Sequence, residues 1–98
     1  MIVRYTDRVK DDVESDFLWY EKQKKGLGIE FLDSIEMNLD NIVTFPEMYK
    51  TCYSNFRRCV IRRFPFSIFY TIENEEIIVH SVFDNRQNPK KVPSKDEK

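Results

Sequence analysis

The chain lacks long apolar runs, and this shortage bears on where the protein acts. No apolar stretch approaches the roughly 18 residues that a membrane-spanning helix needs, and the longest such runs are much shorter. Residues 1–7 also lack the charged-then-apolar order of a secretory signal peptide. We therefore expect a cytoplasmic protein with no membrane partner.

Cysteine and histidine are also scarce. Cys52 and Cys59 do not have the spacing of a metal-binding pair, and His80 is the single histidine. We expect two reduced, partly buried thiols that act as small apolar side chains. No phosphate-binding loop, paired nucleophile and base, or metal-ligand cluster is present in the sequence. We therefore expect neither a cofactor nor a metal ion.

The apolar content that is present is rich in large rings. Hydrophobic residues make up 41% of the 98 residues and include eight Phe and five Tyr, so a few core positions can bury a large area. This predicts one small domain over residues 1–92, followed by a flexible charged tail at residues 93–98. The net charge is −1, but basic residues gather at positions 57–63 and 86–91. This distribution leaves room for a local anion-binding site.

Apolar spacing predicts a strand and two helices in the first half. Residues 2–5 alternate like a short strand, and Thr6 or Asp7 can cap a helix whose apolar face carries Val9, Val13, Phe17 and Tyr20. Gly26-Leu27-Gly28 is predicted to break this helix. A second helix follows and must end before Pro46, and its apolar stripe consists of Phe31, Leu32, Ile35, Leu39 and Ile42.

After Pro46 the apolar pattern has the period of strands. It predicts strands over residues 49–53, 57–64, 66–72 and 77–83, with a hairpin turn at residues 73–76. One sheet face is expected to pack on the helices, and it carries Phe66, Ile68, Tyr70, Ile72, Ile77, Val79 and Phe83. The sequence thus predicts a two-layer α+β fold with an N-terminal strand, an antiparallel helix hairpin and a mostly antiparallel sheet of three to four strands.

Four arginines within seven residues are the main candidate for a functional surface. On a strand over residues 57–64, Arg58 and Arg62 lie on one side, and Arg57 and Arg63 on the other. Guanidinium groups bind phosphate or carboxylate, and the neighbouring aromatic rings could stack on bases. The alternative is pairing with the many acids of the helices. The cluster is thus either a surface for nucleic acid or an acidic protein, or an internal ion-pair network.

Two further residues belong to the candidate surface. His80 could act as a general acid or base near neutral pH, but alternation places it opposite Ile77 and Val79 with no nucleophile nearby, which favours a half-exposed strand histidine. Tyr70 is predicted to be a core residue whose hydroxyl reaches the sheet edge. No catalytic residue is assigned, and the candidate functional surface comprises Arg58, Arg62, Arg63, Arg86, His80 and Tyr70.

Three segments of the chain together match the pattern of a known protein family. They are Gly26-Leu27-Gly28 with Phe31 and Leu32 after it, residues 62–70 (RRFPFSIFY), and residues 86–89 (RQNP). They resemble the interhelical Gly-Leu-Gly, the arginine–Phe-Pro-aromatic–Tyr strand pair and the closing Arg-Arg-Asp-Pro of the RelE/ParE superfamily of type II toxin-antitoxin systems. The likeness is strongest to the ParE, or plasmid-stabilisation, branch of these bacterial toxins and spans nearly the full chain.

The resemblance implies a toxin that a cognate antitoxin neutralises. The expected assembly is either a homodimer of the toxin or a toxin-antitoxin hetero-oligomer. RelE-like members cleave mRNA on the ribosome, whereas ParE-like members poison DNA gyrase. At the position of Ser67, RelE-like toxins carry a catalytic arginine, and two lysines precede it at the positions of Arg58 and Val60. Because two of these cations are missing here, the resemblance favours a gyrase inhibitor that is not an enzyme.

Two alternatives remain open on the sequence. One is a ribosome-dependent endoribonuclease with the ribosome and mRNA as partners, and the other is an inactive protein that only binds an antitoxin. The chain also departs from the ParE branch, because the usual His-Gly-Arg-Arg-Asp-Pro reads DNRQNP at residues 84–89 and lacks one His and one Arg. A weakened or retargeted toxin fits this departure. The arginine cluster further predicts an apolar, acidic antitoxin segment that wraps the helices and covers part of the sheet.

Overall fold

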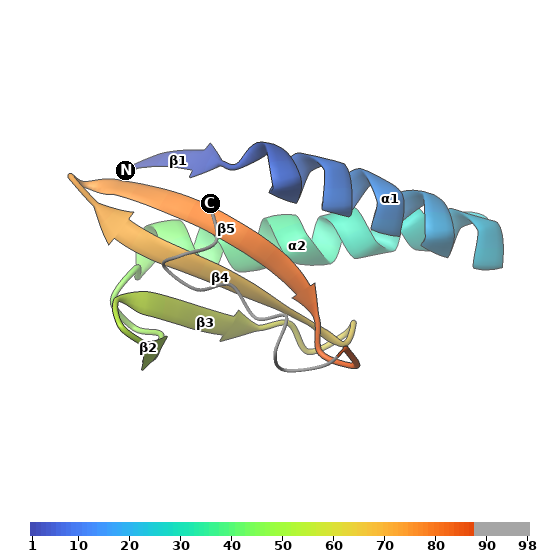
Figure 1. Ribbon diagram of the computed structural model, residues 1–98. Helices are drawn as coiled ribbons and strands as arrows, with labels where there is room; N and C mark the ends of the chain where they lie inside the picture. Colours follow the sequence, from blue (N-terminus) through green and yellow to red (C-terminus); the bar gives the residue numbers. More distant parts are fainter. Residues whose placement is uncertain (88–98) are drawn as a thin grey trace.

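Two helices pack on one face of a five-stranded sheet in the computed structural model, which describes residues 1–87 (Figure 1). The chain order is β1 (Ile2–Tyr5), α1 (Asp7–Gln23), α2 (Leu27–Thr44), β2 (Thr51–Tyr53), β3 (Phe56–Val60), β4 (Phe66–Glu73) and β5 (Glu76–Asp84). The strand order in the sheet is β1-β5-β4-β3-β2. β1 runs parallel to β5, and the other pairs are antiparallel.

The predicted two-layer α+β class is therefore confirmed. The sheet has five strands and not the predicted three to four, because the N-terminal strand β1 joins it through parallel pairing with β5. The predicted tail at residues 93–98 lies outside the described residues, as does the end of the predicted domain at residue 92. Within residues 1–87, no helix is long and apolar enough to cross a membrane. In the same part of the chain, no group of three or more His, Cys, Asp or Glu side chains is arranged to hold a metal ion.

Local polar contacts fix both ends of the helix hairpin. The Thr6 hydroxyl accepts a hydrogen bond from the Val9 amide at 3.3 Å, as the predicted cap requires. Gly26 turns the chain with φ of +89°, a left-handed conformation that glycine adopts without strain. The Glu21 carboxylate accepts hydrogen bonds from the amides of Gly26 and Gly28, both at 3.0 Å, and so satisfies free donors at the start of α2.

Gly28 has a different role from the predicted one. It lies inside α2 and does not break the chain between the helices. An added Cβ at Gly28 would lie 2.7 Å from the carbonyl oxygen of Phe17 and 2.8 Å from its ring. The missing side chain therefore lets α1 and α2 approach each other closely.

The main core lies between the helix pair and the sheet. The rings of Tyr20, Phe31, Phe64 and Phe66 contact one another there with centroid distances from 5.0 to 6.3 Å. All of these contacts except the tilted Tyr20–Phe31 pair are edge-to-face, and such contacts add to the gain from burying the rings. The predicted helix-facing residues Phe66, Ile68 and Tyr70 all belong to this core.

A β-bulge in β5 changes which residues face the helices. Phe69 pairs with Ser81 and Tyr70 pairs with Val79, so His80 is an extra residue between the two pairs. The alternation of side chains shifts by one residue beyond such a bulge. As a result Val82 joins the helix-facing core, whereas Phe83 lies in the second cluster with Phe56 and Phe69. The prediction that Phe83 faces the helices is wrong for this reason.

The strand predicted over residues 57–64 is also shorter than expected. β3 ends at Val60, and residues 61–65 form a turn before β4 begins. Pro65 has no amide hydrogen to continue the ladder, and the buried rings of Phe64 and Phe66 pack against α1 and α2. The expected alternation of Arg62 and Phe64 with Arg58 on one strand face is therefore wrong.

Candidate functional surfaces

Two of the four clustered arginines are satisfied within the chain. The Arg57 guanidinium donates hydrogen bonds to the carbonyl oxygens of Glu47 at 3.2 Å and Tyr49 at 2.6 Å. Arg63 leaves the turn toward α2 and forms an ion pair with Glu30. The internal-pairing alternative thus holds for these two side chains. Arg63 does not lie on a common surface with Arg58.

Arg58 lies on the sheet face away from the helices and is held by neutral partners. Its Nε donates to the Ser67 hydroxyl at 2.9 Å, and its Nη2 donates to the Asn85 side-chain oxygen at 3.1 Å. The guanidinium carbon lies 5.6 Å from the centroid of the Phe69 ring, in a cation–π contact. No carboxylate in the described part of the chain pairs with Arg58. Its charge and that of the exposed Arg62 remain available to an anionic partner.

His80 lies on the same face but is not arranged for proton transfer. The Thr71 hydroxyl donates to the Glu73 carboxylate at 2.6 Å, so its oxygen accepts from His80 Nε2 at 2.9 Å. Burial lowers the pKa of His80, although the nearby Glu73 acts in the opposite direction. The ring also packs on Phe56, with 4.7 Å between centroids. The structure therefore contains a half-buried strand histidine whose pKa is lowered by burial.

Tyr70 is a core residue and does not reach the face of Arg58. Its side chain is fully buried, and its hydroxyl donates to the Pro46 carbonyl oxygen at 2.6 Å. Burial raises the pKa of Tyr70 to about 12. The hydroxyl thus ties the segment that follows α2 to the sheet, and the buried Tyr70 side chain does not belong to an exposed surface.

Arg86 lies at the end of β5, near α1. Its guanidinium donates to both carboxylate oxygens of Asp84, at 3.0 and 2.8 Å, and these hydrogen bonds hold the pKa of Asp84 below its ordinary value. Asp16 of α1 is close to this pair. Burial raises the pKa of Asp16 from 3.8 to about 6, with further contributions from Asp12 and Asp84 that Arg86 partly offsets. The arginines of the predicted surface thus lie in separate parts of the structure.

Substitution of Asp16 with asparagine is expected to stabilise the fold above pH 6. A carboxyl group whose pKa is raised in the folded state destabilises that state when ionised, and the cost is lost as the pH falls from about 6 through 3.8. Because the side chain is only half-buried and water screens it, we expect a gain of about 1 kcal/mol at pH 7.5. Urea unfolding at pH 7.5 and pH 4 measures it.

The gain from Asp16→Asn should shrink toward zero at pH 4. Asp33→Asn, on the exposed side of α2, provides the matched control and should change the stability by less than about 0.5 kcal/mol at either pH. An Asp16→Asn gain that is equal at both pH values would contradict the role assigned to burial.

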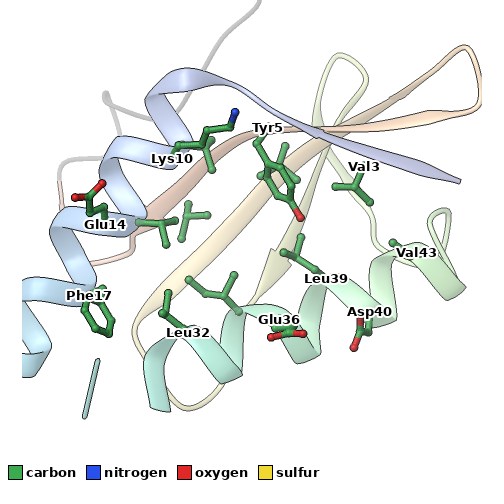
Figure 2. Close-up of a pocket in the computed structure, with 15 residues that line it drawn as sticks. Val3, Tyr5, Lys10, Glu14, Phe17, Leu32, Glu36, Leu39, Asp40 and Val43 are labelled. Atoms are coloured by element: carbon green, nitrogen blue, oxygen red, sulfur yellow. The ribbon is translucent and has the colours of Figure 1, made fainter. Parts of the chain in front are cut away.

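The structure also contains a groove that the sequence pattern does not predict. It has a volume of about 760 Å³ and opens between β1, α1 and α2 (Figure 2). Its apolar lining includes Val3, Val9, Val13, Leu32, Leu39 and Val43. Its charged residues are Lys10, Glu14, Glu36 and Asp40. We call this feature the helix groove. In the sequence, the groove corresponds to the apolar stripe of α2, because several residues of that stripe line the groove.

The order of elements and the sheet topology together define a RelE/ParE-like fold. A solved structure described as the chromosomal ParDE TA system from P. aeruginosa matches it with a TM-score of 0.76. The match has 14% sequence identity and covers 86% of this chain and 95% of that chain, which shows a shared fold. A search of curated proteins found no matching relative.

Family comparison identifies the branch. The family model described as the ParE toxin of the type II toxin-antitoxin system, parDE, matches residues 3–89. The chain therefore belongs to the ParE toxin family of type II toxin-antitoxin systems. The resemblance stated from the three sequence segments is confirmed.

Proposed function

We propose that the protein inhibits DNA gyrase and is neutralised by a cognate antitoxin in the cytoplasm. The observation that carries the choice of target is the environment of Ser67. RelE-like toxins have a catalytic arginine at this position, but here a small hydroxyl side chain is fully buried. The Ser67 hydroxyl accepts a hydrogen bond from Arg58 Nε at 2.9 Å and donates one to the Asn85 side-chain oxygen at 2.7 Å, so it forms part of a hydrogen-bond network.

The neighbouring positions do not restore the missing charge. Val60 is 55% exposed and apolar, where RelE-like toxins have a lysine. Cleavage of a phosphodiester needs cations around the phosphate, and the loss of one such contact typically costs about 10²–10³ in rate. Of the three positions that carry cations in RelE-like toxins, only that of Arg58 carries one here. The His80 ring nitrogen is hydrogen-bonded to Thr71. These facts support a target other than mRNA.

The helix groove supports neutralisation by a protein partner. A hydrophobic groove between elements is a usual docking site for an amphipathic helix. Large apolar side chains also remain exposed nearby on β1, including Ile2 at 61% and Tyr5 at 41%. A partner that covers the groove and this strand would bury apolar surface that the chain leaves open.

Added to translating ribosomes, the purified protein should leave mRNA intact. Primer extension on a ribosome-bound message measures this, with a RelE-type ribonuclease on the same message as the positive control. The expected pattern has no new 5′ ends, because two of the cations that stabilise a cleaved phosphate are absent. Cleavage at defined codons that disappears on Arg58→Ala or Arg86→Ala would overturn the proposal and favour the ribonuclease alternative.

A further inference from the structure

The rim of the helix groove carries more acid than base. Glu14 projects from α1, and Glu36 and Asp40 project from α2, against the single cation of Lys10. None of these three carboxylates forms an ion pair within residues 1–87. The groove therefore presents negative charge that the described part of the chain does not neutralise.

Two of these acids, Glu36 and Asp40, lie on the α2 side of the groove, across from Tyr5 of β1. Figure 2 shows Tyr5 pointing from β1 toward α2, the helix that carries Glu36 and Asp40. Burial raises the pKa of Tyr5, and the charges of Glu36 and Asp40 raise it further. The Tyr5 hydroxyl therefore interacts electrostatically with both carboxylates, and the two acids and Tyr5 line the same part of the groove.

The apolar lining of the groove has the length and spacing of a helix contact. Leu32, Ile35, Leu39 and Val43 recur along α2 every three or four residues. They span eleven residue steps, which is about 16 Å or three helical turns. Val13 and neighbouring residues of α1 form the opposite wall. A short amphipathic helix that lies along α2 fits this lining.

We propose that the helix groove binds an amphipathic helical segment of the antitoxin with aliphatic residues on one face and Lys or Arg on its flanks. This inference rests on the proposed neutralisation by an antitoxin and specifies its chemistry. Charge complementarity across an interface favours the correct partner and disfavours like-charged ones. A basic flank would meet Glu14 on one side of the groove, and Glu36 and Asp40 on the other.

This partner has the opposite charge to the one that the sequence predicts. The sequence predicts an acidic antitoxin segment because it shows no partner for the four clustered arginines. In the structure Arg57 binds two carbonyl oxygens and Arg63 binds Glu30, whereas the groove acids are unpaired within residues 1–87. A second copy of the chain is disfavoured as the occupant, because its helices would bring further acids against Glu36 and Asp40.

Two synthetic peptides test the charge of the occupant. Both are helical, about 18 residues long, with the same leucine stripe, and they differ only in carrying lysine or glutamate on the flanks. Fluorescence anisotropy with the full chain should give the lysine peptide an affinity about tenfold or more higher at low salt. The difference should decrease at high salt, where charges are screened. Equal or tighter binding of the glutamate peptide would overturn the inference.

A double variant assigns the preference to the groove. Glu36→Gln with Asp40→Asn should reduce the preference for the lysine peptide to about twofold, since it removes the charges on the α2 side. Removal of a like-charged pair four residues apart on a helix does not destabilise the helix, so unfolding cannot mimic this result. Asp33→Asn, on the same helix but outside the groove lining, should leave the preference unchanged. An unchanged preference in the double variant would overturn the inference.

The antitoxin itself separates this inference from the proposed function. A complex whose affinity is the same for the Glu36→Gln/Asp40→Asn variant and the natural chain would overturn the charged groove, while neutralisation would stand. A fall of about tenfold in affinity for the double variant, with no change for Asp33→Asn, is the expected result. If no antitoxin relieves growth arrest by the natural chain, the proposed neutralisation fails, whatever the peptides show.

Discussion

Replacement of Phe31 with alanine is expected to lower the free energy of unfolding by about 3–5 kcal/mol. Phe31 is fully buried, and its ring lies 5.0 to 5.4 Å from the rings of Tyr20, Phe64 and Phe66. Alanine would leave a cavity where α2 meets the turn at residues 61–65. A small domain has only about 5–15 kcal/mol of stability, so chemical unfolding at neutral pH should show a much lower midpoint.

Phe45→Ala provides the matched control for Phe31→Ala. Its side chain is 59% exposed at the end of α2, so the same change of residue should cost less than about 0.5 kcal/mol. A Phe31→Ala variant that loses less than about 1 kcal/mol would contradict the assignment of this ring cluster as the centre of the core.

Inhibition of gyrase is the second large expected effect. Purified protein should reduce the rate of DNA supercoiling by about tenfold or more. We expect this target because the alternative activity in the superfamily is mRNA cleavage. The buried Ser67 and the apolar Val60 cannot stabilise the charge on a cleaved phosphate. Preincubation with the antitoxin should restore supercoiling, because an antitoxin would cover the helix groove and neighbouring surface.

Features that depend on nearby residues could be predicted from the sequence. The helix stripes, the Thr6 cap and the end of α2 before Pro46 each depend on residues within a few positions. The same holds for the hairpin between β4 and β5, whose turn residues Asn74 and Glu75 have positive φ. These local signals agree with one another, which is why the fold class was predicted correctly.

Features that depend on distant residues could not be predicted. The bulge at His80 is defined by the pairing of β5 with β4, and alternation along β5 alone does not reveal it. Gly28 has its effect through contact with Phe17 of the other helix. The arginine pattern failed for the same reason: Arg63 pairs with Glu30, 33 residues away in the chain. The helix groove likewise needs three elements at once.

A supercoiling assay with purified gyrase, relaxed plasmid and ATP tests the assigned target most directly. Protein at increasing concentration should leave the plasmid relaxed, and the same samples should leave a ribosome-bound message uncut. Full supercoiling at every concentration, together with cleavage of the message at defined codons, would contradict gyrase as the target of this ParE-family chain.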